Sequence, residues 1–92
     1  MQDIIIDINK RIRGESRGEY LQRKFTEAYE KSIEEECTVT IRGYFYKSDL
    51  KIVNQITKGL EPVKKTPIKG SGYIASYLIY ANAPHIPRPY EI

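Results

Sequence analysis

The 92-residue sequence predicts a two-layer α/β sandwich of the α+β type, with a mixed sheet and helices on one face. Two observations support this prediction. Strand-like segments, in which apolar and polar residues alternate, are followed along the chain by helix-like segments, in which apolar residues recur every three or four positions. The last two strand-like segments are then separated by a Gly-rich turn, which is typical of a hairpin. The expected order is β-α-β-α-β-β in a single domain, residues 1–81, followed by a proline-containing tail, residues 82–92.

The first two elements are a short strand and an amphipathic helix. Residues 4–8 are mostly β-branched, which favours a strand. Residues 17–35 carry an apolar stripe at helical spacing. Ser16 and Glu19 have the spacing of a capping box, so the helix is expected to begin immediately after Ser16.

A second strand and a second helix follow without a long connection. Residues 37–46 alternate between an apolar face and a polar, aromatic face. Ser48 or Asp49 can cap a helix whose apolar stripe extends to Leu60. This helix can cover the apolar face of the strand, and the rest of the chain is expected to pack around that unit.

The last two strands differ in character. Residues 63–69 are basic and include Pro67, which excludes a central strand and favours an edge segment. Residues 70–72 form a Gly-Ser-Gly turn. Residues 73–81 are substantially apolar on both faces, which predicts a central strand or an interface strand.

Composition indicates an ordinary soluble globular chain, with 40% hydrophobic and 29% charged residues. So small a core would gain from association, and we expect a homodimer. No apolar run is long enough to cross a bilayer, and Asp3 and Asp7 interrupt any signal-peptide core. The single cysteine, Cys37, leaves no intramolecular disulfide and no cysteine cluster for zinc. We therefore expect a cytoplasmic protein without a membrane partner.

The charge is unevenly distributed along the chain, although the net value is only +3. Residues 1–36 hold seven Lys and Arg against nine Asp and Glu, whereas residues 37–92 hold eight against three. Local basic stretches can bind polyanions without a high total charge. One such stretch joins the first strand to the first helix, whose N-terminus also favours phosphate. Its cations are Lys10, Arg11, Arg13 and Arg17. The alternative is a solvated loop without a ligand.

The polar face of the second strand is a further candidate contact with nucleic acid. Arg42, Tyr44 and Tyr46 are expected to project together from it. Tyrosines can stack on unpaired bases while arginine holds phosphate. The alternative is that Tyr44 and Tyr46 pack beneath another element or form a dimer contact. Lysines beside the predicted turn could extend this surface as an arm, or form a plain charged surface; they are Lys64, Lys65 and Lys69.

The order of elements and the position of the basic residues resemble the Alba family of small archaeal nucleic-acid-binding proteins and their relatives in RNase P. The resemblance covers most of the chain, to about residue 81, and is most specific at Ile41-Arg42-Gly43. The family also carries basic residues just after its first strand, where this chain has Lys10, Arg11 and Arg13. It implies binding of DNA or RNA as a dimer.

In the Alba family the final hairpin forms an arm that reaches along the nucleic acid. Lys64, Lys65, Lys69 and the turn at residues 70–72 occupy that place here. The chain departs from the family at residues 44–46, where Tyr-Phe-Tyr stands in place of a basic loop. A similar strand-helix-strand order occurs in the small-subunit ribosomal protein of the NusE type, another RNA binder.

An alternative function rests on the eight tyrosines of a chain that has no tryptophan. Tyrosine supplies amphipathic area at protein interfaces. Tyr73, Tyr77 and Tyr80 on the last strand could form a subunit interface, or belong to the core. Together with the proline tail, they would suit a small protein-interaction or virion-type assembly subunit.

The sequence offers little support for catalysis. The lone histidine, His85, lies between prolines in the tail. Asp3 and Asp7 are too few for a metal constellation and have no histidine near them in sequence. The Gly-Ser-Gly turn lacks the Gly-Lys-Ser/Thr of a phosphate loop. We therefore expect no enzyme, no catalytic residues, no cofactor, no metal and no small-molecule substrate.

Overall fold

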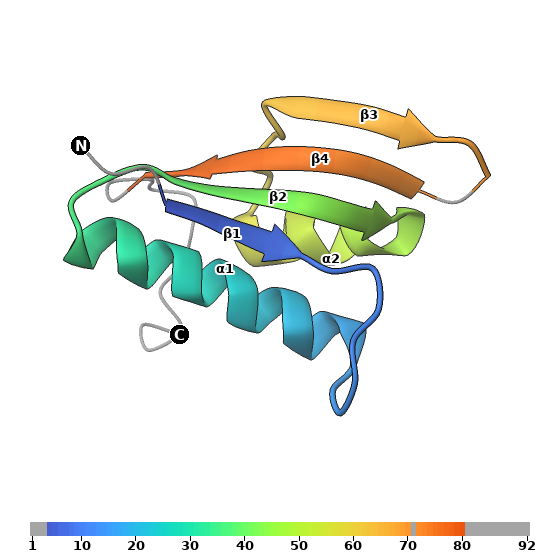
Figure 1. The fold of residues 1–92 in the computed structure, drawn as a ribbon, viewed down its shortest axis with the longest axis horizontal. Helices are drawn as coiled ribbons and strands as arrows, with labels where there is room; N and C mark the ends of the chain where they lie inside the picture. The colour runs from blue at the N-terminus through green and yellow to red at the C-terminus, as the bar shows by residue number, and fades with distance from the viewer. Residues whose placement is uncertain (1–3, 71, 81–92) are drawn as a thin grey trace.

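The computed structural model of the chain describes residues 4–70 and 72–80, which form two layers (Figure 1). The elements are β1 (Ile4–Ile8), α1 (Arg17–Glu34), β2 (Val39–Tyr46), α2 (Lys47–Thr57), β3 (Lys64–Ile68) and β4 (Gly72–Ile79). The strands form one sheet in the order β1-β2-β4-β3. β1 is parallel to β2, and the other neighbours are antiparallel. The predicted α+β class with a mixed sheet is confirmed.

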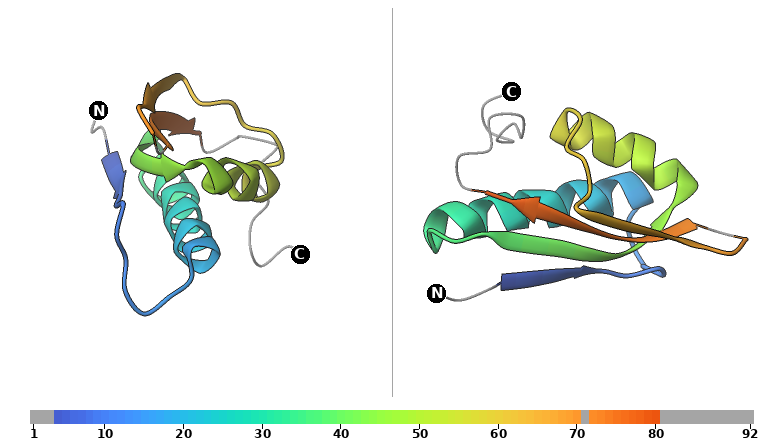
Figure 2. Two further views of the ribbon diagram at one scale, coloured as in Figure 1. Left: turned by 90° about the vertical axis from the view of Figure 1, so that its right-hand side faces the viewer. Right: turned by 90° about the horizontal axis from the view of Figure 1, so that it is seen from above.

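Both helices lie against the same face of the sheet, as expected (Figure 2). The core between the layers is built from fully buried side chains of α1 and β2, among them Leu21, Phe25, Ile41 and Phe45. β3 is an exposed edge strand that contains Pro67, and β4 is central, as the sequence indicated. In the described ranges no helix covers the other face of the sheet, which we call the open face (Figure 2).

The start of α2 differs from the sequence prediction. Tyr46 is the N-cap, and α2 begins at Lys47 rather than after a cap at Ser48 or Asp49. Asp49 instead lies in the first turn, where its Oδ2 accepts a hydrogen bond of 2.8 Å from the backbone N–H of Tyr46. The helix therefore follows β2 directly, and the end of β2 is fixed to the first turn of α2.

Glu36, just after α1, adopts a left-handed φ of 50°. This region is unfavourable for residues other than glycine, and an acidic side chain is disfavoured near a helix C-terminus. We expect Glu36→Gly to raise the free energy of unfolding by about 1 kcal/mol. For a domain of this size, that gain corresponds to a rise in Tm of roughly 4–8 °C. Thermal unfolding followed by circular dichroism measures it.

The matched control for this prediction is Glu35→Gly. It removes the same charge one residue earlier, where φ is −94° and glycine relieves no strain. Glycine at this position should leave Tm unchanged or lower it, because the added freedom of the unfolded chain offsets the loss of an unfavourable charge at the helix C-terminus. Equal gains from the two substitutions would show that charge, rather than backbone geometry, limits the stability of this turn.

Candidate nucleic-acid interface

The β1–α1 loop, residues 9–16, projects at one end of the sheet (Figure 1). The predicted capping box forms where the loop enters α1. Ser16 Oγ accepts a hydrogen bond from the backbone N–H of Glu19, and Glu19 Oε1 accepts one from the backbone N–H of Ser16. The hydrogen bond that the carboxyl accepts from the Ser16 backbone is the main cause that holds the pKa of Glu19 below its usual value. The N-terminus of α1 therefore carries a carboxylate of its own, which opposes the phosphate binding expected there.

Three cations of this loop are exposed at its surface: Lys10, Arg11 and Arg13. They line a concave surface of about 700 Å³ together with Ile12, Glu15, Arg17 and Tyr46. The carboxylate of Glu15 is paired with Arg23 at 2.6 Å. Within residues 4–70 and 72–80, no acidic side chain forms an ion pair with any of the three cations. Their charge is therefore available to a polyanion.

Arg17 differs from these three cations because its guanidinium is directed inward. Its Nε donates to Asp49 Oδ2 at 2.8 Å, its Nη1 to the Asn9 carbonyl at 2.6 Å and its Nη2 to the Tyr44 carbonyl at 2.8 Å. The Asp49 side chain is 1% exposed and that of Arg17 is 16% exposed. Arg17 thus connects the loop, β2 and α2. We assign it a positioning role rather than the direct contact expected from sequence.

Tyr44 and Tyr46 support the loop from the open face. Their rings meet edge to face with centroids 4.9 Å apart. The Tyr46 hydroxyl donates to the Lys10 carbonyl at 3.0 Å, and the Lys10 ammonium lies 5.1 Å from the centre of the Tyr44 ring. Tyr44 is buried, so its ring has little surface left for stacking on a base. Tyr46 is half-buried and lines the loop concavity.

Arg42 belongs to a second group of polar side chains, on the open face. The register aligns Asp7 of β1, Arg42 of β2, Ser76 of β4 and Lys64 of β3 in one row across the sheet. Arg42 Nε lies 3.5 Å from Asp7 Oδ1, and both side chains are exposed. The row borders a hollow of about 440 Å³ that also involves Gly43, Thr66 and Ile74.

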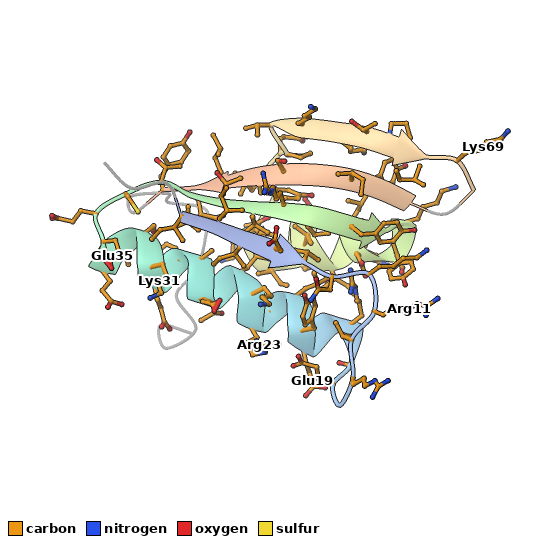
Figure 3. The ribbon with its side chains drawn as sticks, viewed as in Figure 1. Arg11, Glu19, Arg23, Lys31, Glu35 and Lys69 are labelled. Carbon is orange, nitrogen blue, oxygen red and sulfur yellow. The ribbon has the colours of Figure 1, made fainter. Side chains whose placement is uncertain are left out.

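The three lysines predicted to form one arm are separated by the alternation of β3. Lys64 is on the open face, beside the hollow. Lys65 faces the helix layer, where its ammonium lies 4.5 Å from the centre of the Tyr73 ring. Lys69 extends from the hairpin turn at the end of the molecule that also carries Arg11 (Figure 3). The fold therefore places Lys69 at the end of the molecule that carries the loop, and Lys64 in the same cross-strand row as Arg42. Lys65 is on the opposite face from Arg42 and is not part of either group.

The tyrosines of β4 do not form a single surface. Tyr77 is 2% exposed and packs edge to face against Phe25 and Phe45. Burial raises the pKa of Tyr77 to about 12. It is therefore a core residue in this fold, and its expected place in a subunit interface is corrected. Tyr73 is half-buried on the helix side and Tyr80 is exposed. The proline tail, residues 82–92, and His85 lie outside the described residues.

Sequence reasoning missed the hollow on the open face. Its neutral members are Gly43, Thr66, Ile74 and Ser76. The alternation of β4 already places Ile74 and Ser76 on the face opposite Tyr77, so the sequence indicated that these two residues share a face. The partner of β4 was not apparent, because residues 63–69 carry no strand pattern strong enough to fix their register.

No family model, curated protein or solved structure matches the chain. The described residues contain no group of three or more His, Cys, Asp or Glu side chains that could hold a metal ion. In the same ranges, no helix is long and apolar enough to cross a membrane. Fold and site together define a small two-layer α+β protein, with a basic loop at one end of a sheet of which one face has no helix over it within residues 4–70 and 72–80.

Proposed function

We propose that this protein binds nucleic acid, with the β1–α1 loop as its main contact with phosphate. The observation that carries the proposal is the set of three exposed cations on this loop, Lys10, Arg11 and Arg13, for which the described residues supply no acidic partner. Cations that are not neutralised within the protein gain most from phosphate, because binding releases counterions from the nucleic acid.

Two further features support the proposal. The start of the loop is held in place at the Asn9 and Lys10 carbonyls by Arg17 and by the hydroxyl of Tyr46, so its backbone is fixed there before a ligand arrives. Lys69 at the hairpin turn extends from the same end of the molecule, which would let one polyanion contact both segments (Figure 3). The Alba-like hypothesis uses these same two segments, the loop after the first strand and the final hairpin.

The test is binding of the full chain to labelled double-stranded DNA, single-stranded DNA and structured RNA, at several salt concentrations. We expect the Lys10/Arg11/Arg13→Ala variant to lose affinity by roughly 100-fold near 0.1 M salt. Three lost phosphate contacts should also reduce the slope of log Kd against log salt by about 2.7 for a duplex. The probe bound most tightly identifies the natural class of nucleic acid.

The matched control is Lys31/Lys51/Lys58→Ala, which removes the same charge from exposed positions on or next to the helices. It should retain most of the affinity and the salt slope. Equal losses in the two variants would mean that net charge, rather than the loop, drives binding. If the unmodified protein binds none of the probes at low salt, the proposal fails and the assembly-subunit hypothesis takes its place.

A further inference from the structure

The open face of the sheet carries a second surface with its own chemistry. Ile5, Ile68 and Ile74 are 46%, 38% and 44% exposed, respectively. The strand registers place all three on the side of the sheet opposite the helices. Ile74 lines the hollow, whereas Ile5 lies in the row of Thr40 and Leu78, toward the other end of the sheet. The apolar surface offered to a ligand is therefore the floor of the hollow.

Cations flank the apolar part of this face. Arg42 and Lys64 are in the same cross-strand row, separated by β4, and therefore lie about 10 Å apart across the sheet. Ile74 and Ser76 lie between them and line the hollow of about 440 Å³. The surface thus combines an apolar floor with a positive charge on each side.

Asp7 is the one acidic side chain of this row, and it does not neutralise the surface. It is paired with Arg42 at 3.5 Å, and both side chains are more than half exposed. An exposed pair at this distance contributes little stability, so a phosphate can displace the carboxylate from the guanidinium.

The open face is continuous with the basic loop. Tyr46 lines the loop concavity and is also the cross-strand partner of Gly72 on the open face. Tyr44, over which the Lys10 ammonium lies, is the cross-strand partner of Ile74. Tyr44 and Tyr46 therefore join the loop to the open face, and Asp7 is the one acidic side chain among the residues that line the hollow.

We propose that the open sheet face binds a single strand of nucleic acid, with an unpaired base in the hollow against Ile74 and phosphates on Arg42 and Lys64. This inference deepens the proposed function and rests on it. A base within a duplex is stacked and paired, so it cannot enter a hollow in a sheet, whereas an unpaired base can. The loop contacts phosphate, which single strands and duplexes both present, so the loop does not distinguish between them. The open face of the sheet supplies the preference for a single strand.

Charge favours this occupant over a protein partner. The hollow is bordered by two cations, Arg42 and Lys64, and by the one carboxylate of Asp7. It also adjoins the cationic loop through Tyr44 and Tyr46. A polyanion with apolar bases matches both the charge and the apolar floor, whereas a second copy of the chain would bring a face with the same excess of positive charge.

The experiment compares labelled oligo(dT) with a hairpin duplex in fluorescence anisotropy, using the full chain. Ile74→Ser, at an exposed position that should tolerate the change, is expected to weaken oligo(dT) binding about tenfold, because it removes the apolar surface on which the base packs, and to leave duplex binding unchanged. Arg42→Gln/Lys64→Gln should also reduce the oligo(dT) salt slope by about 1.4. Val63→Ser is the matched control, because Val63 is exposed but does not line the hollow.

Equal losses for oligo(dT) and the duplex, or no loss with Ile74→Ser, would overturn the inference. It would also be overturned if Ile74→Ser converted a dimer to a monomer in sedimentation while oligo(dT) affinity stayed the same, because the face would then be a protein interface. These outcomes differ from failure of the proposed function itself. In that case the unmodified protein binds neither probe, or its affinity does not respond to Lys10/Arg11/Arg13→Ala.

Discussion

Arg17→Ala is expected to lower the free energy of unfolding by about 3–5 kcal/mol, more than the loss of any exposed cation. The substitution leaves the carboxylate of Asp49 buried and without its cation, since the Asp49 side chain is only 1% exposed. Asp49 Oδ1 already has no hydrogen-bond partner among the described residues, so the carboxylate would keep the backbone N–H of Tyr46 as its donor and no cation. The carbonyls of Asn9 and Tyr44 lose their donor as well. Urea unfolding measures the change.

Two further variants separate the charge of Arg17 from its geometry. Arg17→Lys keeps the charge but cannot serve three acceptors with a planar fork, so we expect an intermediate loss. Arg17→Met/Asp49→Leu removes both charges and should recover much of the stability, as replacement of buried ion pairs by apolar residues does. If Arg17→Ala lowers the free energy of unfolding by less than about 1 kcal/mol, the Arg17–Asp49 pair contributes no more than an ordinary surface ion pair. That result would contradict the positioning role of Arg17.

The salt dependence of binding distinguishes a positioning role for Arg17 from a direct contact. If its guanidinium held a phosphate, Arg17→Lys would preserve that contact and Arg17→Ala would reduce the duplex salt slope by about 0.9. With a positioning role, Arg17→Lys already weakens binding, because the loop is no longer held at the Asn9 carbonyl. The slope then changes little, because Lys10, Arg11 and Arg13 still provide the contacts.

The sequence predicted those features that depend on near neighbours. The capping box of Ser16 and Glu19 spans three residues, and α1 begins where this spacing indicates. The alternation of residues 37–46 correctly separated Ile41 and Phe45, which face the helices, from Arg42 on the open face. Such periodicities are set by the geometry of a single helix or strand, and they need no knowledge of the rest of the fold.

Features that depend on distant partners could not be predicted in the same way. Arg17 and Asp49 are separated by 32 positions in sequence, and only the packing of α1 beside α2 brings them together. For this reason Arg17 looked like one more cation of a basic loop. The hollow on the open face likewise requires the register of β3 against β4, which pairs Lys64 with Ser76. The composition of residues 63–69 does not reveal that register.

Gly43→Ala is the second substitution for which we expect a large effect. Gly43 is opposite Ile8 at the end of the parallel β1–β2 pair. A Cβ at this position would lie 2.2 Å from the Ile8 carbonyl oxygen, and the φ of 149° is one that residues with a side chain rarely adopt. The close approach and the backbone conformation each cost about 1–3 kcal/mol. We therefore expect a loss of about 2–6 kcal/mol in the free energy of unfolding, measured by urea denaturation.

Gly18→Ala is the control, because a Cβ on Gly18 meets no atom within 4 Å and α1 continues through it. Alanine there should raise stability by about 0.5–1 kcal/mol through helix propensity.

Gly43→Ala can be accommodated only if β1 moves away from β2, and β1 leads directly into the loop through Asn9. If stability falls by less than about 1 kcal/mol, β1 has moved, and amide shifts in residues 9–13 would then reveal the displacement. Affinity for nucleic acid would fall in that variant even though every cation is still present, because the loop requires the β1–β2 pair to hold its position.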